Sequence, residues 1–155
     1  MATLGKLVFA CVSPHGWLLI PQISGPDGAK AVSSRAALAE LGRRMEAAQP
    51  ETIVVVEPHG LQVEGAIALL DTISVAGTTG GPPAQGATAH VYGLRFVVDR
   101  ALTAGIADEA RRVGVPVRRV RNALEFIPLP IEYGTMTPLW FLGATLSKPP
   151  AIVVA

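Results

Sequence analysis

Two short, continuous apolar runs constrain the fold of this chain more than any other feature. The first is Leu7–Val12 and the second is Thr52–Val56. A run of this length without polar alternation is expected of a strand that is buried on both faces. Between the two runs, apolar residues recur at helical spacing from Ser33 or Ser34, which can cap a helix, to about Ala48. This strand–helix–strand unit predicts two parallel strands joined by a right-handed crossover.

The rest of the chain continues the alternation of strands and helices. Further strands are expected at 66–76, 91–98, 115–120 and 151–155, an irregular loop at 77–83, and helices at 99–113 and 137–142. The pattern predicts an α/β fold of three layers, with a mixed, largely parallel sheet and helices on both faces. Because the last residues are strand-like and have no polar tail, we expect residues 1–155 to form a single, incomplete domain of a larger fold.

Composition excludes several classes of partner. Of the 155 residues, 50% are hydrophobic and 16% are charged, which is the balance of a globular protein with a real core. The formal net charge of +1 gives no electrostatic reason to expect nucleic acid or an anionic membrane as a partner. The single cysteine, Cys11, excludes an internal disulfide, and no apolar run approaches the ~18–20 residues of a membrane span. We therefore expect a cytoplasmic location.

The same three letters, Pro-His-Gly, follow both apolar runs. They place His15 after Leu7–Val12 and His59 after Thr52–Val56. The carboxyl ends of parallel strands are where open α/β sheets bind ligands, and imidazole is the commonest protein ligand for divalent transition metals. The pair therefore predicts a metal site, of the kind in which two His and one carboxylate occupy one face of an Fe(II) ion. The alternative is that two loop His follow strands by chance and bond to the backbone.

The other titratable residues have simpler interpretations. His90 is expected to be a strand or surface residue, Cys11 an inert core residue, and Asp99 the cap of the helix at 99–113. Asp71 is expected to be a polar group at a strand end. For Glu57 two interpretations stay open, a polar strand end or a partner of the His59 site.

Three ordered segments resemble a known family. They are Ser13-Pro14-His15, Ser34-Arg35-Ala36-Ala37-Leu38 and Thr52–Gly60. Together they are similar to the amino-terminal half of the class III extradiol ring-cleaving dioxygenases, the superfamily that includes the protocatechuate 4,5-dioxygenase catalytic chain. Residues Tyr133–Trp140 resemble that family's motif Asp-His-Gly-Thr-Met-Val-Pro-Leu.

The resemblance implies a non-haem Fe(II) enzyme that opens a catechol-type aromatic ring with O₂. His15 and His59 take the positions of the first two iron ligands, and Mn(II) or Zn(II) could replace Fe(II). The family's third ligand, a Glu, belongs to its carboxyl-terminal half. A carboxylate such as Glu57, a second chain or a homo-oligomer would therefore have to complete the site.

Tyr133 stands where the family has a proton-handling His. Near neutral pH a phenol is a poorer base than imidazole, so Tyr133 is expected either to donate a hydrogen bond to bound oxygen or to be a helix-entry residue that packs on Pro130. Two alternatives therefore remain. One is a non-catalytic, Memo-like scaffold or binding module that keeps the fold without ring cleavage, and the other is a metal-dependent hydrolase that uses the same two His.

Overall fold

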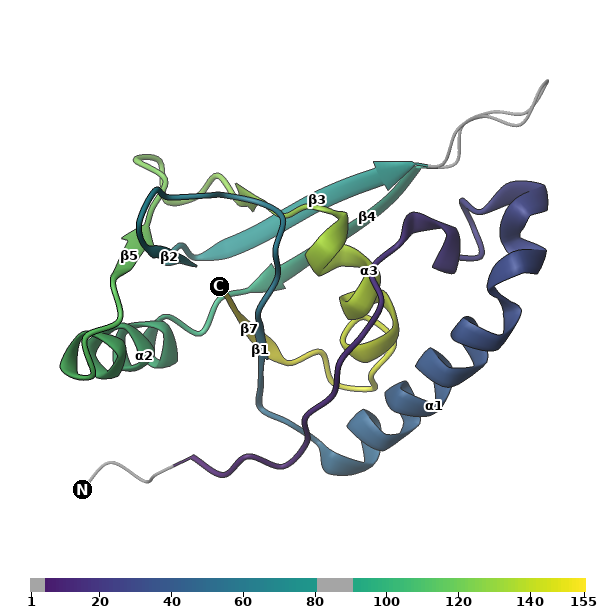
Figure 1. Ribbon diagram of the computed structural model, residues 1–155, viewed down its shortest axis with the longest axis horizontal. Helices are drawn as coiled ribbons and strands as arrows, with labels where there is room; N and C mark the ends of the chain where they lie inside the picture. The colour runs from purple at the N-terminus through teal and green to yellow at the C-terminus, as the bar shows by residue number, and fades with distance from the viewer. Residues whose placement is uncertain (1–4, 81–90) are drawn as a thin grey trace.

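The computed structural model of the chain describes residues 5–80 and 91–155 (Figure 1). Its α-helices are α1 (Val32–Ala48), α2 (Arg100–Arg112) and α3 (Tyr133–Leu142), and two short 3₁₀ helices, η1 (Trp17–Leu19) and η2 (Gly25–Ala31), precede α1. Its strands are β1 (Thr52–Val55), β2 (Ile67–Leu70), β3 (Ser74–Gly80), β4 (Val91–Val97), β5 (Val117–Val120), β6 (Leu129–Pro130) and β7 (Ala151–Val154).

Parallel pairing predominates among these strands. β1 pairs with β7, β2 with β5, and β3 with β6, all in parallel, whereas β3 and β4 pair antiparallel. In the described part of the chain, the strands form three small sheets instead of the single sheet expected, and a parallel bridge from Val98 to Ile152 connects the end of β4 to β7. The expected fold class, mixed α/β with mostly parallel pairing, is therefore confirmed.

Strand β7 lies in the middle layer of the fold, and its side chains alternate between two cores. Val153 packs with Ala107 of α2, whereas Ile152 and Val154 pack in the cluster that includes Met136 of α3. Because successive side chains of a strand point to opposite faces, helices must cover both faces of β7. Figure 1 accordingly has α2 on one side of β1 and β7, with α3 and α1 on the other. The three expected layers are present.

The helices begin where local chemistry and packing allow. Asp99 caps α2 as expected, because its Oδ1 accepts a hydrogen bond of 2.9 Å from the Leu102 amide. Helix α1 instead begins at Val32, so Ser33 and Ser34 lie inside it and cap nothing. Helix α3 begins at Tyr133, four residues earlier than Thr137, so Pro138 lies inside the helix, where its missing N–H leaves one backbone hydrogen bond unmade, and the Met136 side chain is fully buried.

Two of the strand and loop predictions in the middle of the chain are wrong in the described residues. The expected strand at 66–76 is two strands, β2 and β3, which Asp71 and the residues after it separate. Residues 77–80 belong to β3 instead of a loop, and residues 81–83 lie outside the described part.

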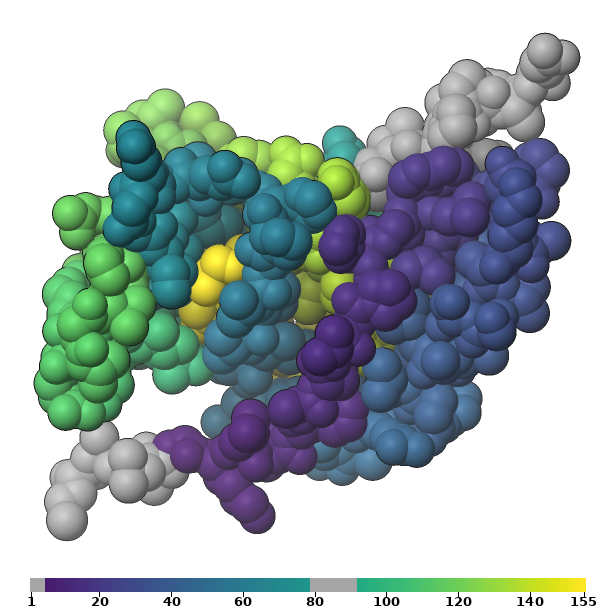
Figure 2. Space-filling model, in the orientation of Figure 1, coloured from purple at the N-terminus to yellow at the C-terminus, as the bar shows by residue number. Residues whose placement is uncertain are grey.

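Leu7–Val12 has no regular structure, although its apolar run predicts a buried strand. The Leu7 side chain is 82% exposed and that of Val12 is 96% exposed. The segment lies beside β1 across a cavity of about 600 Å³ that both of them line, instead of pairing with the strand. Figure 2 has it, in purple, running across the face of the molecule next to α1.

Candidate metal centre

His15 and His59 meet although they are 44 residues apart in the sequence. His15 lies just before η1 and His59 follows β1. Their Nε2 atoms are 3.0 Å apart, the ring centroids are 4.8 Å apart, and the two rings lie at 68° to each other. Both side chains are half-buried. The structure therefore brings together the two His that the repeated Pro-His-Gly motif singled out.

Tyr133, the first residue of α3, completes a cluster of three rings. Its Oη atom is 3.4 Å from His59 Nε2, and its ring centroid is 4.8 Å from that of His59 and 5.8 Å from that of His15. The side chain is 39% exposed, so part of the ring remains accessible to solvent. A group that enters the site would meet imidazole nitrogens and one phenol oxygen.

The spacing of the two imidazoles fits a shared metal ion. Imidazole nitrogens bind divalent ions such as Zn²⁺ at about 2.0–2.1 Å, so two of them lie about 3.0 Å apart at the right angle of an octahedral ion and about 3.3 Å apart at the tetrahedral angle that Zn²⁺ prefers. His15 and His59 have the first of these separations between their Nε2 atoms. The same contact is also a hydrogen bond if one ring donates and the other accepts. Within residues 5–80 and 91–155, no group of three His, Cys, Asp or Glu side chains is arranged to hold one ion.

Glu57 lies behind the His pair, between β1 and α3. The Thr135 hydroxyl donates a hydrogen bond of 2.5 Å to its Oε1 atom, whereas the buried Oε2 atom has no partner among the described residues. Burial raises the pKa of Glu57 above its usual range, and the Thr135 hydrogen bond offsets this only in part. The sequence left Glu57 open as a partner of the site and indicated no role for Thr135, although Thr135 lies in the Tyr133–Trp140 segment that resembles the family motif.

Two cavities flank the cluster. One, of about 360 Å³, is lined by His59 and the residues after it, by Leu70, and by the end of β7. The other is the cavity of about 600 Å³ between Leu7–Val12 and β1, and His15, Glu57 and Gly134 contribute to its wall. Both volumes lie in the range of small-molecule sites, and the smaller one suits a ligand with a single ring.

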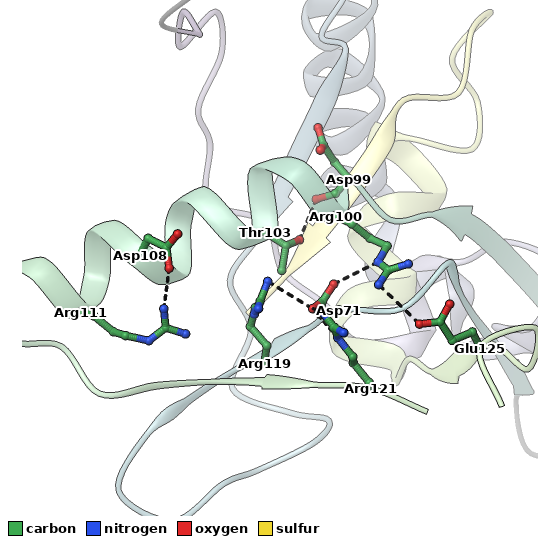
Figure 3. A network of polar contacts seen from close by, with 9 residues as sticks. All are labelled: Asp71, Asp99, Arg100, Thr103, Asp108, Arg111, Arg119, Arg121 and Glu125. Carbon is green, nitrogen blue, oxygen red and sulfur yellow. Dashed lines mark hydrogen bonds and ion pairs between the residues drawn. The ribbon is translucent and has the colours of Figure 1, made fainter. Parts of the chain in front are cut away.

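Asp71 is the centre of a separate polar network (Figure 3). Its side chain is 1% exposed and forms ion pairs with Arg121 at 2.6 Å, Arg100 at 3.2 Å and Arg119 at 3.5 Å, and Arg100 also lies 3.5 Å from Glu125. Burial raises the pKa of Asp71, but the hydrogen bonds from Arg121 and Arg100 outweigh it, so the pKa lies below its usual range. Asp71 does follow β2, as expected of a polar group at a strand end, but the arginines were not foreseen.

The remaining predictions on single residues have mixed outcomes. Cys11 was expected in the core and is exposed, because the segment that carries it does not form a buried strand. His90 lies outside the described residues. Among the helices of the described residues, none is long and apolar enough to span a membrane.

Comparisons with known proteins agree with the resemblance found in the sequence motifs. No curated protein matches the chain. The model of one family, described as the catalytic LigB subunit of aromatic ring-opening dioxygenase, matches residues 9–155. The match includes both Pro-His-Gly motifs, the helix between them and the Tyr133–Trp140 segment. Over nearly its whole length, this chain therefore belongs to the family of aromatic ring-opening dioxygenase catalytic subunits.

Proposed function

We propose that the chain is the amino-terminal part of a non-haem Fe(II) extradiol dioxygenase that opens a catechol-type ring with O₂. The observation that carries the proposal is the 3.0 Å separation of the Nε2 atoms of His15 and His59, which suits two ligands of one ion. Membership of the ring-opening dioxygenase family supports the reaction class. Fe(II) suits an enzyme that uses O₂, and Mn(II) or Zn(II) could occupy the same pair of imidazoles.

Each residue of the cluster has a proposed role. His15 and His59 hold the ion, which when bound lets O₂ and the aromatic diol react so that the carbon–carbon bond beside the diol breaks. The Tyr133 hydroxyl lies 3.4 Å from His59 Nε2 and would donate a hydrogen bond to an oxygen atom of a substrate held beside His59. The third ligand comes from another part of the protein or from a second chain, since the described residues hold no group of three.

The cavity of about 360 Å³ next to His59 is the proposed place for the aromatic ring. Its walls are mostly apolar, with Leu61, Val63 and Leu70 among the residues that line it. Apolar walls exclude water from the ring, while the polar diol faces His59 at one end of the cavity. This arrangement favours a one-ring substrate over a larger fused system.

One observation favours a second candidate function, a non-catalytic scaffold or binding module of the Memo-like kind. In the part of the chain that the structure describes, the His pair lacks a third His, Cys, Asp or Glu close enough to hold the same ion. Two imidazoles bind a metal more weakly than a complete facial triad does. A chain that kept the fold and lost ring cleavage could keep the two His and lack a third ligand.

Anaerobic titration with Fe(II) tests the proposal. We expect the wild-type chain to bind one ion, the double variant His15→Ala/His59→Ala to bind none, and His90→Ala, which removes the third His of the sequence, to bind like wild type. Equal binding by the double variant would refute the metal site. O₂ uptake with catechols, followed by the absorbance of a ring-opened product, then separates enzyme from scaffold: iron binding without O₂ uptake favours the scaffold.

A further inference from the structure

Glu57 connects three separate elements behind the His pair through its backbone and its side chain. Its backbone amide donates to the Ala155 carbonyl at 3.0 Å, which continues the pairing of β1 with β7. Its Oε1 atom accepts the 2.5 Å hydrogen bond from Thr135 in the first turn of α3. Two residues later, the chain reaches His59. Glu57 thus fixes the end of β1 against the start of the helix that carries Tyr133.

Two glycines lie against the two oxygens of this carboxylate. Gly60 belongs to the second Pro-His-Gly motif, and Gly134 belongs to the Tyr133–Trp140 segment. A Cβ atom on Gly60 would lie 3.0 Å from Glu57 Oε1. A Cβ atom on Gly134 would overlap Glu57 Oε2 and lie 3.1 Å from His59 Cδ2. The Glu57 carboxylate and the edge of the His59 ring therefore share the space above Gly134, where no side chain would fit.

Gly134 has no conformational reason to be glycine. It lies inside α3, and it is not among the glycines with positive φ, whereas Gly60 has a φ of +96°. Glycine in a helix is less favourable than alanine by about 1 kcal/mol, so space must explain its use here. The close approach of Glu57 and His59 supplies that explanation.

We propose that Glu57 is a positioning residue, whose link to Thr135 and packing on Gly134 hold His59 and Tyr133 at the separation the candidate metal centre needs. The buried Oε2 atom supports this role: it has no hydrogen-bond partner among residues 5–80 and 91–155, and an unsatisfied buried polar group in a native structure calls for a functional explanation. The metal-binding part of the inference rests on the proposed function. The part that concerns the orientation of the His59 ring is independent of the proposed function.

The first experiment therefore measures the metal-free protein. Nitrogen-15 NMR of the imidazole side chains resolves the three His of the sequence. We expect Glu57→Ala and Thr135→Val to shift the His59 ring resonances and Glu57→Gln, which can still accept from Thr135, to leave them near wild type. Glu51→Ala removes an exposed carboxylate just before the other end of β1 and serves as the matched control. Unchanged His59 resonances in both Glu57→Ala and Thr135→Val would overturn the proposal.

The second experiment adds Co(II) alone as the probe and reads its absorbance. Loss of a residue that orients a metal-binding His lowers affinity by about 10- to 100-fold, so Glu57→Ala should bind Co(II) at least about 10-fold more weakly than wild type. Glu57→Gln should restore most of that affinity, and a Glu57→Gln variant as weak as Glu57→Ala would mean that charge, and not position, matters. If wild type binds no Co(II), the proposed function fails, while the NMR experiment still decides the role of Glu57.

A double-mutant cycle tests the packing directly. Gly134→Ala alone should displace His59, because its Cβ would overlap Glu57 Oε2 and lie 3.1 Å from His59 Cδ2, and the double variant Glu57→Ala/Gly134→Ala should shift His59 by less than the sum of the two single shifts. Gly105→Ala is the control, since that glycine of α2 has open space around its Cβ position. Additive shifts for Glu57 and Gly134 would contradict the proposed packing. Circular dichroism melts of each variant establish that it is folded.

Discussion

Thr52 and Asp99 join the first residue of β1 to the cap of α2. The Thr52 hydroxyl donates a 2.7 Å hydrogen bond to Asp99 Oδ2, while Asp99 Oδ1 accepts from the Leu102 amide. One carboxylate thus serves a strand and a helix that are 47 residues apart in sequence. The amide of Asp99 also donates to the Ile152 carbonyl of β7, so the three elements meet at this residue.

Asp99→Ala should therefore destabilise the fold by more than the loss of a helix cap alone. We expect a decrease of about 1–2 kcal/mol in the free energy of unfolding, since both a cap and a half-buried hydrogen bond are lost. Thr52→Val removes only the hydrogen bond to Asp99 and should lower the free energy of unfolding by about half as much. Urea denaturation measures both. Ser33→Ala is the control: because Ser33 lies inside α1 and caps nothing, stability should stay within about 0.5 kcal/mol of wild type.

Asp71→Asn should both lower stability and flatten its dependence on pH. Because Asp71 is 1% exposed and holds three partly exposed arginines, we expect a loss of about 2 kcal/mol at neutral pH. The folded-state pKa of Asp71 is depressed, so its contribution is complete above the unfolded value of about 3.9 and disappears as the pH falls through the lower, folded value.

Thermal unfolding between pH 7 and pH 3 measures this difference. The gap between wild type and Asp71→Asn should narrow as the solution becomes acidic. Asp108→Asn removes an exposed carboxylate that pairs with Arg111 on α2, and it should change little at any pH. A gap that stays constant to pH 3 would show that the charge of Asp71 is not what stabilises the fold.

Tyr133→Phe should slow ring cleavage without weakening metal binding. The substitution keeps the ring that contacts His59 and removes only the hydroxyl, 3.4 Å from His59 Nε2. Loss of one hydrogen bond to a reacting oxygen predicts a decrease in kcat of about 10-fold, with the affinity for Co(II) unchanged. Steady-state O₂ uptake and a Co(II) titration check the two parts. An unchanged kcat in Tyr133→Phe and in Tyr133→His would assign Tyr133 a purely structural role.

Ala66→Phe should block the cavity beside His59. Ala66 lines this space of about 360 Å³, and a benzyl group would occupy the volume proposed for the substrate ring. We expect KM for a catechol to rise by about 10-fold, which corresponds to about 1.4 kcal/mol of lost binding. Ala37→Phe on the exposed side of α1 is the control. If KM stays the same in Ala66→Phe, the substrate binds elsewhere, with the larger cavity next to His15 as the remaining candidate.

The sequence predicted the site better than the strand that leads into it. The His15–His59 contact followed from a repeated local motif, and the Asp99 cap from its place before an amphipathic helix. Leu7–Val12 has the composition of a buried strand, but strand formation also needs an edge to pair with, and composition says nothing about where that edge lies. Its six apolar residues therefore predicted a strand wrongly, because local propensity does not include the availability of a partner strand.

The contacts of Glu57 with Thr135 and Gly134 could not be predicted from sequence patterns. Glu57 and Thr135 are 78 residues apart, and their contact depends on how α3 packs against the end of β1. The register of a helix against a strand is set by shape complementarity among many side chains. One local anomaly pointed to the contact: a glycine inside a helix whose backbone does not require it.

His15 and His59 differ in what holds them. His59 follows a strand whose backbone is paired along its length with β7, whereas His15 follows an exposed segment without regular structure. Backbone hydrogen bonds hold a paired strand end in place, and a segment outside the strands has no such ladder. If the pair holds an ion as proposed, His59 would therefore supply the more firmly placed of its two imidazole ligands.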